Sequence, residues 1–350
     1  MALQVGIVGL PNAGKSTIFN ALTKSSVPAE NFPFSTIDPN VGVVAVPDDR
    51  LDALDSIVHA SRIIPATVSF VDIAGLVRGA ADGEGLGNQF LAHIRETDAI
   101  VYMLRAFKDE SIVHVEGRID PLDDLLIINT EIGLKDIETL EKLLAGEAKK
   151  LRVGDKDAIK RSLVLEKIKE TLLGGQYDIS LDEEEKELIK ECNLLSLKPK
   201  IYVLNVSEDQ LHTDIDFPYN HIKISAKFEA ELANMPDLDK KEFLAMAGID
   251  KPGIMLLAEE AYRTLGLIHF LTAGEMEVRA WTIKKGTKAP DAAGVIHTDF
   301  RDKFIRLEVV SFVDYMKYGG WNEAKEKGLL KAEGKEYVVA DGDVVLVRHS

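Results

Sequence analysis

The sequence predicts an α/β protein with a mostly parallel sheet, an inserted helical arm and a small mixed α/β domain at its C-terminal end. Up to about residue 266, short apolar strands alternate with helical segments, as in a parallel sheet covered on both faces. Between residues 121 and 198 we find no convincing strand, and apolar residues recur at helical spacing. From residue 267, short strand-like runs are broken by glycine and proline. We therefore expect three domains, formed by residues 1–120 with 199–266, by residues 121–198 and by residues 267–350.

Each domain is predicted from its own pattern. The main sheet should contain the strands Leu3–Gly9, Val41–Val46, Thr67–Asp72, Ala99–Leu104, Lys200–Val206 and His221–Ser225, with a helix from about Lys15. In the arm, one apolar stripe ends before the turn signal Val153-Gly154-Asp155 and another begins after it, which predicts an antiparallel helical hairpin. The C-terminal domain should contain the strands Glu277–Ile283, Phe304–Val310 and Val344–Val347.

Composition narrows the class of protein. No apolar run is long enough to cross a bilayer, and the N-terminus lacks the pattern of a signal peptide. The single cysteine, Cys192, excludes a disulfide framework and a multi-cysteine metal site. We therefore expect a cytoplasmic protein without a membrane partner. The net charge of -16 argues against DNA and against general nucleic-acid binding, although a local basic face can still contact RNA.

The strongest motif is a phosphate-binding loop, Gly9–Ser16, with the spacing GxxxxGK(S/T) between a strand and a helix. Glycines let the backbone curl so that its N–H groups point at phosphate oxygens, and the helix N-terminus adds its dipole. Asn12, Ala13 and Gly14 should line this cradle. Lys15 should reach the β- and γ-phosphates as the catalytic lysine, and Ser16 should bind Mg²⁺.

Two further loops are expected near the γ-phosphate. Asp72 begins a DxxG motif at a strand end, where its carboxylate can bind Mg²⁺ through water and the Gly75 N–H can meet the phosphate. Thr36 lies in the loop between the first helix and the next strand, the place of a first switch, and can give Mg²⁺ a second hydroxyl. A loop threonine with a structural hydrogen bond is the alternative interpretation.

The base site favours adenine. Asn205-Val206-Ser207-Glu208 stands where a GTPase would carry Asn-Lys-x-Asp. Adenine has no donor at N1 for a carboxylate to accept, whereas Asn205 can pair with N7 and an exocyclic amine. Val206 also replaces the lysine whose stem would cover the base. Against this, the loop that begins at Ser225 keeps the Ser-Ala-Lys sequence usual in GTPases.

Together these motifs resemble a known family. Gly9–Thr17, Asn31–Phe34, Asp72–Val77 and Gly83–Leu91 are similar to the Obg-related translation-factor NTPases. Adding Asn205-x-x-Glu208 makes the resemblance specific to the YchF, or Obg-like ATPase, branch. The runs Arg279–Ile283 and Ala293–Phe300 resemble the TGS domain of that family, a ubiquitin-like α/β fold.

The resemblance implies an OBG-type G domain with a coiled-coil insertion and a TGS domain. It also implies binding of ATP, with GTP a poorer ligand, together with Mg²⁺ and association with the ribosome, on its large subunit. Carried over by position, the nucleotide is contacted by Asn12, Ala13, Gly14, Lys15, Ser16, Thr17 and Val206, while Ser16 and Thr36 bind Mg²⁺.

Hydrolysis needs help that the DxxG motif does not supply. Many switch GTPases place a glutamine after this motif to orient water, but here the residue is Leu76. Asn12 could hold K⁺ beside the phosphates, His114 could swing in from its loop, or a partner could act in trans. An Obg-type GTPase and an ATP-sensing switch with little turnover are the rival functions. For ribosome contact we expect basic residues of the C-terminal domain: Lys284, Lys285, Lys288, Arg301, Lys303 and Arg306.

Overall fold

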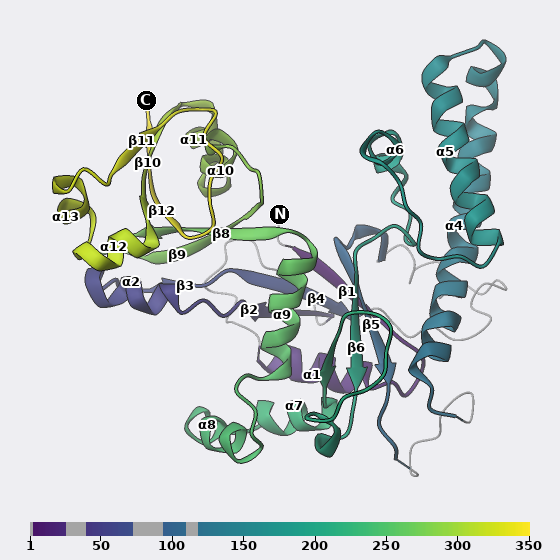
Figure 1. Ribbon diagram of the computed structural model, residues 1–350, viewed down its shortest axis with the longest axis horizontal. Helices are drawn as coiled ribbons and strands as arrows, with labels where there is room; N and C mark the ends of the chain where they lie inside the picture. Colours follow the sequence, from purple (N-terminus) through teal and green to yellow (C-terminus); the bar gives the residue numbers. More distant parts are fainter. Residues whose placement is uncertain (1–2, 26–39, 73–93, 110–117) are drawn as a thin grey trace.

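The computed structural model describes residues 3–25, 40–72, 94–109 and 118–350, which form two six-stranded sheets and a projecting helical arm (Figure 1). The first sheet has the order β2 (Val41–Ala45), β4 (Thr67–Asp72), β1 (Gln4–Val8), β5 (Ala99–Arg105), β6 (Lys200–Asn205) and β7 (His221–Ile224). Only the β2–β4 pair is antiparallel among these neighbours. The six predicted strands are thus confirmed, with ends that differ by a residue or so.

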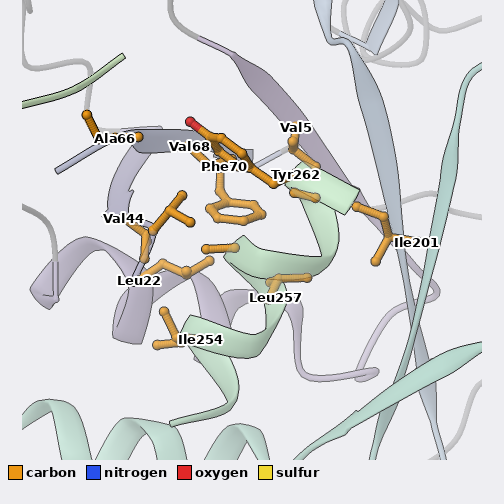
Figure 2. Packing of buried hydrophobic residues seen from close by; sticks show 14 of the residues in the cluster. Val5, Leu22, Val44, Ala66, Val68, Phe70, Ile201, Ile254, Leu257 and Tyr262 are labelled. Atoms are coloured by element: carbon orange, nitrogen blue, oxygen red, sulfur yellow. The ribbon is translucent and has the colours of Figure 1, made fainter. Parts of the chain in front are cut away.

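Helices cover both faces of this sheet. The helices α1 (Lys15–Lys24), α7 (Ala226–Ala233) and α9 (Gly253–Thr264) lie on one face, and α4 (Pro121–Arg152) begins on the other. Figure 2 shows the first interface, where Phe70 of the sheet meets Leu257 of α9 and Leu22 of α1. A further helix of this region, α8 (Asp237–Met246), lies beside α7, where Phe243 stacks on Phe228.

The arm is the predicted helical hairpin. The first turns of α4 pack Leu125 and Ile128 into the core of the main sheet, after which the helix leaves the sheet. Further along, Leu140 forms a separate core with Ile168 of α5 (Lys156–Leu173), and the helices α6 (Glu183–Ile189) and η3 (Lys190–Cys192) follow. Aspartates cap both long helices, because Asp120 and Asp155 accept hydrogen bonds from the first free N–H groups.

The C-terminal sheet has the order β11 (Lys331–Glu333), β10 (Phe304–Ser311), β12 (Asp343–His349), β8 (Leu267–Ala273), β9 (Val278–Lys284) and β3 (Ile63–Ile64). Its two central strands, β8 and β12, run parallel, and β9 and β10 flank them in antiparallel pairs. This is the order of the ubiquitin-like α/β fold that we expected. The helices of this region are α10 (Ala289–Ile296), α11 (Thr298–Asp302), α12 (Phe312–Tyr318) and α13 (Trp321–Glu326).

Three strands of this sheet were not predicted. β8 does not alternate because it is central and covered on both faces, and its polar His269 is buried. β3 has two residues and follows α2 (Arg50–Val58), so a segment of the first domain pairs with β9. The short β11 pairs with β10 at the sheet edge.

The two sheets share one hydrophobic core and a polar contact. Leu271 and Val344 of the second sheet belong to the same buried cluster as Phe70 of the first. Beside that cluster, Arg50 donates to Asp48 at 2.7 Å and to Asp341 at 2.8 Å. The C-terminal sheet is therefore held against the first sheet by both apolar and polar contacts. Within the described ranges, no helix has the length and apolarity to span a membrane.

Candidate functional site

The loop between β1 and α1 has the curled backbone that phosphate binding requires. Asn12 has φ 63° and Gly14 has φ 95°, both left-handed, so successive N–H groups turn to one side as in an anion-binding nest. Glycine is required twice for space. A Cβ at Gly9 would lie 2.5 Å from the Met103 carbonyl oxygen, and one at Gly14 would lie 2.1 Å from Asn205 Nδ2.

Lys15 fills the centre of this loop. Its Nζ donates to the carbonyl oxygens of Gly9 at 2.9 Å and Leu10 at 2.8 Å, and the side chain is buried. Burial lowers the pKa of Lys15 to about 8, and the nearby carboxylate of Asp72 offsets part of that shift. A buried ammonium with a depressed pKa gains more from an anionic ligand than a solvated one would.

Asn205 braces the loop. Its Nδ2 donates to the Ala13 carbonyl oxygen at 2.9 Å, and its Oδ1 accepts from the Ala226 N–H at 3.0 Å. The Asn205 carboxamide can make one more hydrogen bond at each of these two atoms. One N–H of Nδ2 and one lone pair of Oδ1 are therefore available to a purine. Asn205 therefore ties the phosphate loop to the second base loop. The neighbouring Ser225 caps α7 by accepting from the Phe228 N–H.

The residues after Asn205 shape the base side of the site. Val206 is buried in the cluster that also contains Leu10, so its side chain does not extend over a base as a lysine stem would. Glu208 begins a short 3-10 turn and is exposed, which gives its carboxylate freedom to point away from adenine. This turn is held by Gln210, whose Oε1 accepts from the Ser207 hydroxyl at 2.7 Å.

Two side chains with oxygen ligands, Ser16 and Asp72, lie beside Lys15. Ser16 is exposed in the first turn of α1, and Asp72 is the last residue of β4. Burial raises the pKa of Asp72, while Lys15 opposes that rise. A hydroxyl and a carboxylate suit Mg²⁺, which usually takes one or two protein ligands and completes its octahedron with phosphates and water.

The fold brings together site residues that are far apart in the chain. The phosphate loop, Asp72, Asn205 with Val206, and Ser225 follow the carboxyl ends of β1, β4, β6 and β7, which meet at one edge of the sheet. Three predicted site residues, Thr36, Gly75 and His114, lie outside the described residues, as does Leu76.

Sequence reasoning missed one charged side chain at this edge. Arg105 ends β5 opposite Asn205 and is 1% exposed. Its guanidinium lies 4.4 Å from the Phe107 ring centroid and donates to the backbone carbonyl oxygens of Phe107 and Asp109. A lone arginine after six apolar strand residues was the available signal.

Comparisons with known proteins agree with this geometry. The family model YchF-GTPase_C, described as a protein of unknown function, matches residues 267–350. The model MMR_HSR1, described as a 50S ribosome-binding GTPase, matches residues 4–142.

Full-length relatives are also found. The "Ribosome-binding ATPase YchF" of Haemophilus ducreyi is 48% identical over 363 residues, covering 99% of both chains. The protein of the same name from Bacillus subtilis is 47% identical over 364 residues, again covering 99% of both. A solved structure, the Schizosaccharomyces pombe YchF GTPase, has a TM-score of 0.87 and 38% identity, covering 99% of this chain and 97% of that chain. On this similarity along its whole length, and with the match of its C-terminal residues 267–350 to the YchF model, the chain belongs to the YchF family.

Proposed function

We propose that this protein is a ribosome-associated regulatory ATPase that hydrolyses Mg²⁺-ATP to ADP and phosphate, with GTP a poorer ligand. The observation that carries the proposal is the phosphate loop, in which buried Lys15 is held inside a cradle braced by Asn205. The names of the bacterial relatives support ATP and the ribosome. The description of the family model that matches residues 4–142 favours the large subunit as the partner. Action in the cytoplasm, at ribosomes, is part of the same proposal.

In this proposal the described residues bind and orient the phosphates. Lys15 would exchange its two carbonyl partners for β- and γ-phosphate oxygens, while the N–H groups of residues 12–17 point at the same oxygens. Ser16 and Asp72, with Thr36, would hold Mg²⁺, which neutralises phosphate charge when bound. The Gly75 N–H would meet the γ-phosphate.

The names of the relatives differ in the nucleotide: the bacterial proteins are named ATPases, whereas the solved structure is named a GTPase. Exposed Glu208 and buried Val206 favour ATP, and Asn205 and Ser225 would contribute to either base site. Paired titrations with fluorescent ATP and GTP decide this. ATP should bind at least several-fold more tightly, and Glu208→Asp with Val206→Lys should restore guanine binding. A wild-type protein that prefers GTP would make the Obg-type GTPase the correct function.

Slow intrinsic hydrolysis is expected, with acceleration from one of three sources. Asn12, exposed at the rim of the loop, would hold K⁺. His114 would approach from its loop, or a partner would supply a group. Replacing K⁺ by Na⁺ tests the first, and His114→Ala tests the second, with ATP affinity as the control. If neither changes turnover, the partner remains. An ATP-sensing switch would show ATP binding without turnover even when ribosomes are present.

Ribosome association is tested by co-sedimentation with purified ribosomes. The ATP state should bind differently from the ADP state, because the γ-phosphate orders switch loops in such proteins. A non-hydrolysable ATP analogue and ADP should therefore give different bound fractions. Absence of sedimentation with both nucleotides, at every salt concentration, would contradict the proposed function.

A further inference from the structure

The end of the helical arm is basic although the protein is acidic. We call residues 147–161 the arm tip; they comprise the end of α4, the turn and the start of α5. The arm tip has six Lys or Arg and three Asp or Glu, a net charge of +3. The rest of the arm, residues 121–146 and 162–198, has seven basic and fifteen acidic residues, a net charge of -8. The whole chain carries -16. Charge is thus segregated along the arm.

Three cations of the arm tip are exposed and have no acidic partner among the described residues: Lys149, Arg152 and Lys156. The other three are paired, Lys150 and Arg161 with Glu147 and Lys160 with Glu184. Figure 1 shows the turn between α4 and α5 at the far end of the arm, away from both sheets. The unpaired charges therefore lie exposed at the end of the arm that is farthest from both sheets.

The arm tip also contains three exposed apolar side chains. Val153, in the turn, is 83% exposed, and Leu151 and Ile159 beside it are 36% and 40% exposed. None of the three belongs to the buried core of the arm. The arm tip thus combines unpaired positive charge with a small apolar surface, which suits contact with phosphates and with the sugars or bases between them.

The basic residues of the C-terminal domain offer less free charge. Four of the six suggested positions are paired: Lys288 with Glu336 at 2.6 Å, Arg301 with Asp291 at 3.0 Å, Lys303 with Asp299 at 3.9 Å, and Arg306 with Glu308 at 2.8 Å. An RNA phosphate would have to compete with these carboxylates. Most of the basic positions that the sequence suggested for ribosome contact are therefore already partnered, and the arm tip is the better candidate.

We propose that the arm tip is an RNA-contacting surface, in which Lys149, Arg152 and Lys156 bind phosphates of folded ribosomal RNA. This proposal rests on the proposed association with ribosomes. Charge complementarity supports RNA, since the partner must accept three unpaired cations. The acidic body of the arm would be repelled by the same phosphates, so the protein should approach end-on. The 32 residues of α4 make a helix about 48 Å long, which lets the tip reach RNA while the sheets stay outside.

A purely structural role predicts different results. Basic residues in the last turn of α4 also stabilise the negative end of the helix dipole. If that is their only role, replacing them changes the stability of the arm and leaves ribosome binding and its salt dependence alone.

The test compares two triple variants by co-sedimentation with ribosomes at several salt concentrations. The tip variant is Lys149→Ala/Arg152→Ala/Lys156→Ala. The matched control, Lys325→Ala/Lys327→Ala/Lys331→Ala, removes the same charge from exposed positions of the C-terminal domain. The tip variant should bind at least about tenfold more weakly near physiological salt. Its plot of log affinity against log salt should be shallower by about 2 to 3, because each of the three lost phosphate contacts removes roughly 0.7 to 0.9 from the slope.

A second readout identifies the partner directly. A hydroxyl-radical probe tethered at Val153→Cys, in a Cys192→Ser background, should cleave ribosomal RNA at discrete sites. The same probe at Asn322→Cys, on exposed α13, should not cleave those sites. Basal ATPase activity and helical circular dichroism of both triple variants should match the wild type.

The outcomes separate this proposal from the proposed function. If the wild type does not sediment with ribosomes, the proposed function fails and the arm tip proposal fails with it. If the wild type binds ribosomes and the tip variant binds as tightly as the wild type, only the arm tip proposal is overturned. The same holds if the tip variant and the control variant bind equally. Weaker binding with an unchanged salt slope and no RNA cleavage would assign the contact to a ribosomal protein, which also overturns it.

Discussion

The affinity for ATP should fall about tenfold between pH 7 and pH 9, because Lys15 loses its proton in that range. Burial lowers the pKa of Lys15 to about 8 in the nucleotide-free protein. About nine molecules in ten therefore carry the ammonium at pH 7, and about one in ten at pH 9. In the complex, phosphate charges should keep the ammonium protonated throughout this range. If the protonated form alone binds tightly, the loss is about 1.4 kcal/mol.

The assay is a titration with a non-hydrolysable Mg²⁺-ATP analogue from pH 7 to pH 9.5. Calorimetry in two buffers of different ionisation enthalpy should also show uptake of about half a proton per binding event at pH 8. Lys15→Ala is the control, and it should bind weakly with a nearly flat pH profile. A wild-type affinity that stays constant to pH 9.5, or an Ala variant with the same pH dependence, would refute the reasoning.

The same pKa bears on the stability of the nucleotide-free protein. The pKa of Lys15 is 10.5 in the unfolded chain and about 8 in the fold, so the unfolded state binds more protons between these values. Stability therefore rises as pH increases from 8 to 10.5, and the charged, buried lysine costs roughly 3 kcal/mol below pH 8. Lys15→Met should abolish tight ATP binding and hydrolysis without lowering the thermal midpoint at pH 7. A marked loss of stability would show that the two carbonyl contacts of Lys15 outweigh its desolvation.

Three further predictions concern buried polar contacts. Asn205→Ala leaves the buried Ala13 carbonyl and Ala226 N–H without hydrogen-bond partners, so holding the phosphate loop in its binding conformation should cost about 2 kcal/mol. ATP should therefore bind about 30-fold more weakly, as measured by fluorescence titration. Asp136→Ala removes the carboxylate that accepts from two N–H groups and a hydroxyl where the arm returns to the sheet, and should lower stability in urea by about 3 kcal/mol. Burial would raise the pKa of Asp48, but hydrogen bonds from His269 and Arg50 hold it well below its usual range. Asp48→Ala should therefore destabilise the domain contact by about 2 to 3 kcal/mol and separate two calorimetric transitions, which an unchanged single transition would contradict.

Local sequence predicted most of the main sheet because its signals are short-range. The central strands β1, β5 and β6 are buried on both faces and read as apolar runs, and the phosphate loop follows the first of them directly. Local sequence also predicted the arm, because two apolar stripes at helical spacing lie on either side of one turn signal. β8 was missed because its place at the centre of the second sheet, rather than its own pattern, makes it a strand.

The sequence by itself predicted which residues should touch a nucleotide: the loop with Lys15, the carboxylate Asp72, and the Asn205 segment. The tertiary structure decided what each does in the resting protein. The Asn205 carboxamide braces Ala13 across 192 positions of sequence, and Lys15 satisfies two carbonyls with a pKa lowered by burial. The tertiary structure also placed the unpaired cations of the arm tip at the end of a long helix, away from both sheets (Figure 1). The physical reason is that motif and charge are local in the chain, whereas burial, long-range hydrogen bonding and the distance between charges exist only after folding.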